Sequence, residues 1–316
     1  MRNVRALVAL LCASAAGLPT PSFADRPAHP VAQTPTQFDN ELTVWVIPAP
    51  RPAELSWRTP GGLIRRVVTN AVGGMLHIMN RKLGHMGVTV RCGQQEWTGS
   101  MTNSIDAEFQ DIVVKKGYGL GVLFHNFSGA IEPAADMYKS INERYRTGRI
   151  TWVRSGISAQ TCGRLMTWVS EFQKAGVDKF YGLAAKPRYR EGAGCSAFSM
   201  SFLEQAGLLE PAYMPWSFDL RAPMKLIGGP LTGKRWPIAR AMTITRGWAA
   251  ENEPHKRIFG WDPTLGFYWV HNNVKRIERG QRVFSTPATV ERRGHAVGLV
   301  LDRRNVPTPT EPFFKN

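Results

Sequence analysis

A single cysteine stands where the sequence predicts the first turn of a helix. The segment from Glu191 to Gly207 reads EGAGCSAFSMSFLEQAG, so Cys195 directly follows the small residues Ala193 and Gly194. Apolar side chains then recur at helical spacing, and a closing glycine is a typical helix stop. A helix N-terminus stabilises anions, which favours the thiolate, the form that attacks carbonyl carbon. The pattern predicts a nucleophile, and the alternative is a buried structural cysteine.

A thiolate nucleophile needs a base, and histidine is the usual one because its pKa lies near neutrality. Two of the seven histidines, His85 and His295, follow a glycine and precede an apolar run of the kind that forms a strand. The glycine leaves the approach to the ring open, and a strand would hold the ring rigidly. Both histidines are therefore candidates for the base.

The elements that must position these residues can be predicted from the surrounding sequence. Residues 84–93 alternate as in a strand, and residues 94–100 are expected to return antiparallel after Gly93. Ser158 is a predicted N-cap for a helix that runs to Lys174, with Gly176 beyond its end. Further strands are expected at 42–47, 120–124 and 149–153, and further helices at 61–81 and 134–145. After Gly207 the chain is rich in proline, glycine and tryptophan and shows poor helix signals.

Two of these motifs carry a family resemblance. The Cys195 segment resembles the nucleophile helix of NlpC-type papain-like cysteine hydrolases, in which a cysteine followed by a small residue opens a helix that ends in Ala-Gly. The run Gly84-His85-Met-Gly-Val-Thr-Val resembles the histidine strand of that family. Here the histidine precedes the cysteine, an order similar to the circularly permuted branch, which includes lecithin retinol acyltransferase-like proteins and bacterial envelope relatives. The resemblance covers roughly residues 80–210.

The resemblance implies a fold and a set of roles. The fold would be α+β: a papain-like core with an antiparallel sheet packed on helices, and Cys195 at a helix N-terminus. His85 is favoured over His295, because the predicted strands and helix between residues 85 and 195 supply the expected sheet and supporting helix. The family takes its third, imidazole-orienting residue from the strand after the histidine, and Glu96 is the best match there. Tyr181 and Tyr189 precede the nucleophile helix and are candidates for lining the cleft.

The chain divides into four predicted segments. Residues 1–24 have the basic, apolar and small-residue regions of a secretory signal peptide, so the protein is expected in the periplasm or outside the cell. Residues 25–40 lack periodicity and predict a flexible linker. Residues 41–212 would form the catalytic domain, and residues 213–316 a C-terminal extension packed on the core.

Cysteine content and charge narrow the environment and the partners. A Cys92–Cys162 disulfide would leave Cys195 as the unpaired thiol in an oxidising compartment. The formal net charge of +16 favours an anionic partner, and the export signal argues against nucleic acid. An anionic envelope polymer such as peptidoglycan is expected, with membrane-surface contact as a further option. The charges occur in scattered pairs, which predicts a diffuse basic surface. Metal-ligand spacings are lacking, and no cofactor is implied.

These observations predict an exported thiol hydrolase that cleaves an amide bond in the cell envelope, most plausibly in peptidoglycan peptides. One alternative is an acyl hydrolase or acyltransferase that acts on lipids. An apolar groove beside Cys195 would favour the lipid alternative over a polar cleft. The other alternative is a non-catalytic envelope-binding protein in which the cysteine and the histidines are core residues.

Overall fold

The computed structural model describes residues 37–51, 54–75, 83–103, 108, 111–237, 240 and 243–316. These residues belong to one compact unit that spans Pro35–Asn316. The predicted signal peptide, most of the predicted linker and the end of the predicted helix at 61–81 lie outside the described residues. Phe38 is already buried and the first strand begins at Asn40, so the last residues assigned to the linker belong to the folded unit.

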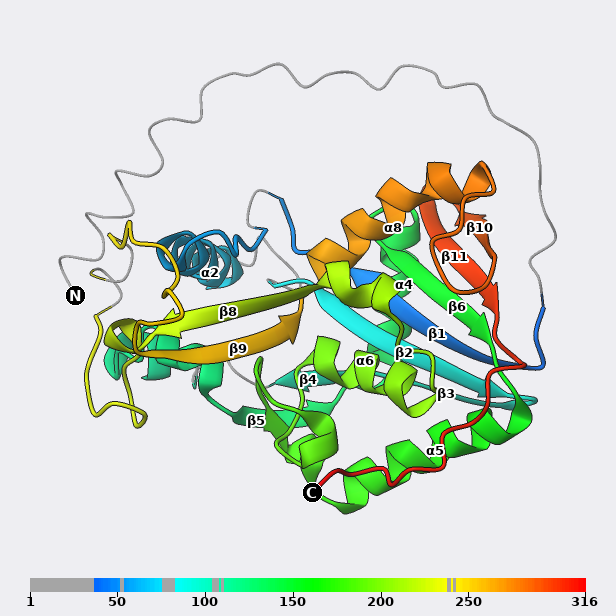
Figure 1. Ribbon diagram of the computed structural model, residues 1–316, viewed down its shortest axis with the longest axis horizontal. Coiled ribbons are helices and arrows are strands. Elements are labelled where there is room, and N and C mark those ends of the chain that lie inside the picture. The colour runs from blue at the N-terminus through cyan, green and yellow to red at the C-terminus, as the bar shows by residue number, and fades with distance from the viewer. Residues whose placement is uncertain are drawn as a thin grey trace. The chain divides into compact units, whose positions relative to one another are not determined.

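A six-stranded mixed sheet forms the centre of the molecule, in the order β10-β11-β6-β1-β2-β3 (Figure 1). Its strands are β1 (Asn40–Ile47), β2 (His85–Cys92), β3 (Gln95–Gly99), β6 (Thr151–Gly156), β10 (Ala288–Arg293) and β11 (Ala296–Asp302). Neighbouring strands are antiparallel except for β11 and β6, which are parallel. The α+β class is therefore as expected, but the prediction of an antiparallel sheet is wrong. The parallel pair arises because β11 comes from the C-terminal part of the chain and enters beside β6 in the same direction.

Helices cover both faces of this sheet. The α-helices are α2 (Pro60–Met75), α4 (Ala134–Tyr145), α5 (Ala159–Lys174), α6 (Cys195–Gln205) and α8 (Pro263–Glu278). Side chains of α5, α6 and α8 share the main core with Leu42, Val44 and Val46 of β1. The alternate residues Trp45 and Ile47 face α4 on the other side. This alternation is the period of two expected for a strand buried on both faces.

Local sequence signals predicted some helices and strands correctly and others incorrectly. Ser158 caps α5 as expected, because its hydroxyl accepts a hydrogen bond from the Thr161 amide. The predicted strand at Leu120–Phe124 is instead a 3₁₀ helix, and short apolar runs do not distinguish these alternatives. The sequence analysis also missed α8, although Asp262 followed by Pro263 is a helix-start signal.

The C-terminal third is part of the same body as the residues before it. Strands β10 and β11 extend the central sheet, and α8 packs against β1, β6, β10 and β11. Residues 213–316, which the sequence analysis expected to pack on the core as an extension, thus contribute strands to the central sheet.

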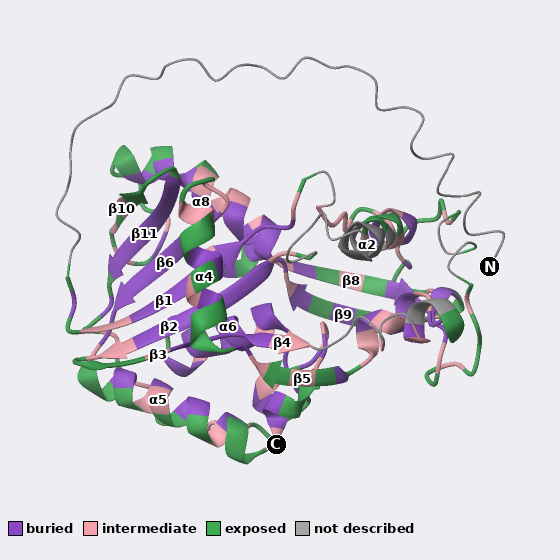
Figure 2. Ribbon diagram, turned by 180° about the vertical axis from the view of Figure 1, so that it is seen from behind, coloured by how far each residue is buried: buried purple, intermediate pink, exposed green. Residues whose placement is uncertain are grey.

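A second, smaller core lies beside the sheet. The antiparallel strands β8 (Ser217–Pro223) and β9 (His255–Trp261) pack their apolar side chains with those of α2. Both views show α2 next to these strands, and Figure 2 shows that exposed residues interrupt β8 and β9. Residues 55–75 and 217–261 are called the hairpin lobe below.

The remaining elements are short. Strands β4 (Met101–Asn103), β5 (Phe127–Ile131) and β7 (Phe180–Tyr181) form a three-stranded sheet. Short helical turns are η1 (Asp111–Lys115), η2 (Leu120–Phe124), η3 (Val177–Lys179), η4 (Pro187–Tyr189), η5 (Pro211–Trp216) and η6 (Met224–Leu226). Within the described part of the chain, no helix combines the length and the apolar character needed to cross a membrane.

Candidate active site

Cys195 is the first residue of α6, as the sequence predicted. Gly194 precedes it with extended backbone angles, and Gly207, with a φ of 69°, follows the end of the helix. The Cys195 side chain is 8% exposed and is not part of a disulfide. The thiol therefore lies at the N-terminal end of the helix, where the helix dipole and the unsatisfied amides stabilise a negative charge.

His85 lies beside this thiol because α6 packs directly against β2. His85 is the first residue of β2 and is 5% exposed. Gly84, just before it, has a φ of 79°, and a side chain there would press against the backbone of Ile47 and Ala49. The glycine before the histidine thus allows the chain to turn tightly into the strand.

The surroundings of Cys195 determine its ionisation. Burial raises the pKa of the thiol, while the hydrogen bond and the charge of His85, the Met86 amide and the Tyr181 hydroxyl lower it. The net result is a pKa of about 7, compared with an ordinary value of 9.0. A substantial fraction of Cys195 is therefore thiolate at neutral pH, which is the state a nucleophile requires.

A buried carboxylate completes the group. Glu132 Oε2 lies 2.7 Å from His85 Nε2, and Glu132 is 4% exposed. Glu132 directly follows β5, and its amide donates a 2.8 Å hydrogen bond to the Ser100 carbonyl. With Nε2 protonated, the ring donates a hydrogen bond to the Glu132 carboxylate, and Nδ1 is then the ring nitrogen that can take a proton from the thiol.

The structure does not place Glu96 at His85. Glu96 lies on β3 opposite Arg91, near the far end of β2, and its carboxylate accepts a hydrogen bond from Tyr138 on α4. Strand β3 runs antiparallel to β2, so its last residues, not Glu96, approach the His85 end. The chain then passes through Ser100 and β4 to β5, which brings Glu132 into the position predicted for Glu96. The sequence analysis missed Glu132 because it did not predict β5, the strand that directly precedes this residue.

His295 lies too far from Cys195 to act as its base. It is exposed, in the turn between β10 and β11, and β11 is separated from β2 by β6 and β1. Three strand spacings correspond to about 14 Å. Of the two histidines left open by the sequence, the structure brings His85 to Cys195.

The two tyrosines upstream of α6 have different places. The Tyr181 hydroxyl donates to Cys195 Sγ over 3.8 Å, and Tyr181 lines the cavity beside the thiol. Tyr189 is exposed, and the Lys186 ammonium lies 5.4 Å from the centre of its ring. Tyr181 therefore belongs to the site, whereas Tyr189 does not line the cavity.

A cavity of about 140 Å³ opens beside Cys195 and is mainly apolar. One wall comes from the hairpin lobe, and the other comes from η2 and the segments that lead into β2 and α6. The apolar side chains that line it are Leu55, Trp57, Leu63, Val67, Leu83, Val122, Leu123, Phe127, Leu183, Ala197, Trp261 and Pro263. Among the described residues of its lining, the charged one is Asp262. Its carboxylate already accepts hydrogen bonds from the Trp57 indole and the Thr264 amide. The cavity therefore offers apolar contact next to the Cys195 thiol.

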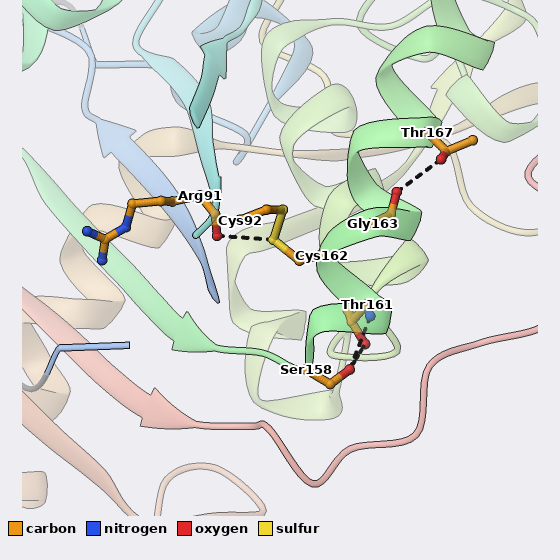
Figure 3. The surroundings of a disulfide bond; sticks show 7 residues. All are labelled: Arg91, Cys92, Ser158, Thr161, Cys162, Gly163 and Thr167. Atoms are coloured by element: carbon orange, nitrogen blue, oxygen red, sulfur yellow. Dashed lines mark hydrogen bonds between the residues drawn. A yellow bond between two sulfur atoms is a disulfide. The ribbon is translucent and has the colours of Figure 1, made fainter. Parts of the chain in front are cut away.

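The disulfide expected between Cys92 and Cys162 is present, so that prediction is confirmed (Figure 3). It joins the end of β2 to the first turn of α5, with Cα atoms 5.8 Å apart. The strand that begins with His85 is thus attached covalently at its other end to a helix of the main core. Within the described ranges, no group of three or more histidine, cysteine, aspartate or glutamate residues could hold a metal ion.

Comparison of the chain with protein-family models, curated proteins and solved structures found no match. Functional inference therefore rests on the site itself.

Proposed function

We propose that the protein is an exported thiol enzyme that transfers an acyl group through Cys195. The observation that carries the proposal is a buried row of three side chains, in which Cys195 contacts His85 and His85 contacts Glu132. Cys195 begins α6 and lines a cavity. A structural cysteine would not require a histidine, an amide and a tyrosine hydroxyl that all favour its thiolate. The papain-like core forms part of this proposal, because a cysteine at a helix N-terminus packed against a histidine strand is the arrangement implied by the family resemblance.

The proposed reaction has two halves. His85 takes the thiol proton, Cys195 sulfur bonds to the substrate carbonyl carbon, and the bond to the leaving group breaks as His85 returns the proton to it. Water, or another acceptor, then gives a proton to His85 and attacks the thioester, which releases the acyl group and regenerates the thiol. Glu132 holds the ring and stabilises its protonated form. The Cys195 amide is a donor for the oxyanion, and the Tyr181 hydroxyl is a second donor close to the sulfur.

The cavity bears on the choice between the two catalytic alternatives. A peptidoglycan peptide carries carboxylates and would require cationic side chains, yet no lysine or arginine is among the described residues that line the cavity. Its apolar walls match an aliphatic acyl chain, whose burial contributes about 0.8 kcal/mol per methylene. We therefore propose an acyl hydrolase or acyltransferase with an apolar acyl group, in place of the envelope amidase that the sequence favoured.

The test is to trap the acyl-enzyme. The protein is mixed with p-nitrophenyl esters of increasing chain length, and intact mass spectrometry follows the adduct on Cys195 while absorbance follows the released phenol. We expect a burst that Cys195→Ala abolishes, with a rate that rises with chain length. Val122→Trp, which fills the cavity, should slow the long esters and spare the acetyl ester.

Two results would count against the proposal. A wild-type rate no higher than that of Cys195→Ala would remove the catalytic role. An adduct that forms from a peptide amide, together with indifference to ester chain length, would restore the envelope amidase.

A further inference from the structure

The positive charge of this protein is concentrated in the hairpin lobe. Residues 55–75 and 217–261 contain eleven lysines and arginines against three acidic residues, an excess of eight out of a formal net charge of +16 for the whole chain. All eleven basic residues are exposed. The sequence analysis expected a diffuse basic surface. Folding brings these two distant segments of the chain, and the excess charge that they carry, into one lobe.

The three acidic residues of the lobe neutralise only part of this charge. Asp219 pairs with Arg257, Glu251 with Arg221 and Glu253 with Arg246. Basic residues outside these pairs lie on several parts of the lobe, including Arg58 before α2, Lys225 on η6, and Lys234 and Arg235 in the segment between β8 and β9. A concentrated excess of this size attracts anionic surfaces over about one Debye length, roughly 8 Å at physiological salt.

Exposed apolar side chains lie in the same region. Leu231 and Phe259, in the hairpin lobe, are 44% and 39% exposed. Leu83 is 42% exposed and also lines the cavity beside Cys195, together with Leu63 and Val67 of α2. The lobe therefore combines cationic side chains, exposed apolar side chains and a wall of the apolar cavity.

We infer that the hairpin lobe docks on a lipid bilayer that contains anionic phospholipids. A bilayer satisfies both features, since its headgroups attract the basic residues and its acyl region accepts the apolar ones. An anionic polymer would satisfy only the charge. Docking does not depend on catalysis, but the delivery of an acyl chain from the bilayer to Cys195 rests on the proposed function.

The experiment measures vesicle binding without turnover. Chains that begin at residue 25 and carry Cys195→Ala retain the compact unit, and they are sedimented with vesicles of phosphatidylcholine alone or with added phosphatidylglycerol. We expect binding to the anionic vesicles only, and its loss at high salt. The triple variant Lys225→Glu, Lys234→Glu, Arg235→Glu should bind on the order of a hundredfold more weakly, because each basic residue near such a surface contributes roughly fivefold.

A matched triple variant separates the lobe from net charge. Lys275→Glu, Arg279→Glu and Arg282→Glu make the same change in charge at exposed positions at the end of α8 and just beyond it, outside the lobe, and should leave vesicle binding within about twofold. Equal losses in the two triples would overturn the inference, as would binding to an anionic polymer such as polyglutamate without binding to vesicles. With Cys195 restored, both triples should hydrolyse soluble acetyl esters normally. Loss of vesicle binding in the lobe triple, with ester hydrolysis retained, would support docking. Absence of ester hydrolysis in every form with Cys195, including wild type, would contradict the proposed function and leave the docking result unaffected.

Discussion

Replacing Glu132 by glutamine tests the arrangement of the site most directly. The change keeps the shape of the side chain but removes the negative charge that lies 2.7 Å from His85 Nε2. Both side chains are at most 7% exposed, so solvent does not compensate for the loss. A buried hydrogen bond to a charged group contributes about 1.5–3 kcal/mol, and one pKa unit corresponds to about 1.4 kcal/mol.

The expected effect on Cys195 follows from these magnitudes. The thiolate is stabilised by the protonated ring of His85, and Glu132 in turn stabilises that ring. Removal of the Glu132 charge should therefore raise the pKa of Cys195 from about 7 to about 8–9. The thiolate population at neutral pH then falls roughly tenfold, and ester hydrolysis should fall by about a hundredfold or more, because proton transfer by His85 is impaired as well.

The assay is the rate of Cys195 alkylation by iodoacetamide, measured by intact mass between about pH 5 and about pH 10. Glu96→Gln is the matched control, because it makes the same chemical change at the carboxylate that contacts Tyr138. We expect the midpoint to move in Glu132→Gln and to stay in Glu96→Gln. Identical profiles for wild type and Glu132→Gln would refute the role assigned to Glu132. A shift in Glu96→Gln alone would support the role that the sequence assigned to Glu96.

Three further outcomes are expected. Because the folded-state pKa of Cys195 is lowered from 9.0 to about 7, its thiolate stabilises the fold above the unfolded-state pKa and loses that contribution as pH falls through about 7. The stability advantage of wild type over Cys195→Ser in urea should shrink accordingly, and a pH-independent difference would contradict this. Removal of the disulfide by Cys92→Ala with Cys162→Ala should cost about 4 kcal/mol, given the sequence separation of 70 between the cysteines. An unchanged denaturation midpoint would show that the bridge does not stabilise the fold. Arg188→Met breaks buried contacts to Glu204 and to the C-terminal segment and should cost about 3 kcal/mol, whereas Arg292→Met, at an exposed pair, should cost less than about 1 kcal/mol in the same measurement.

What the sequence predicted well depends on short-range chemistry. Cys195 opens its helix because small residues precede it and apolar residues follow at the right spacing. Ser158 caps α5 through a hydrogen bond to a residue three positions away. His85 begins β2, and the alternation of the next residues determines which face of the sheet each one occupies. Each of these features is decided within about one helical turn or strand.

What the sequence could not predict depends on where distant segments meet. Glu132 is 47 residues from His85, and its position follows from how the chain leaves β3 and returns through β5. The residues next to Glu132, which directly precedes a proline, give no indication of this contact. Glu96 satisfied the local expectation of a carboxylate on the following strand, but the antiparallel register carried it towards the wrong end of β2. Register is set by pairing, and pairing is not contained in either strand alone.

The cavity beside Cys195 is also formed by segments that lie far apart in the chain. One of its walls comes from two parts of the hairpin lobe: α2, which precedes His85 in the chain, and the segment around Trp261, which follows Cys195. The motifs that reveal a nucleophile and its base lie between these two segments and contain nothing about them. The hairpin lobe as a whole carries half of the formal net charge of +16. Under the proposed function, the lobe would influence which molecule reaches Cys195, whereas His85 and Glu132 would act on the reaction itself. Substitutions in the lobe should therefore change substrate preference and surface binding, whereas substitutions at His85 and Glu132 should change the rate on every substrate alike.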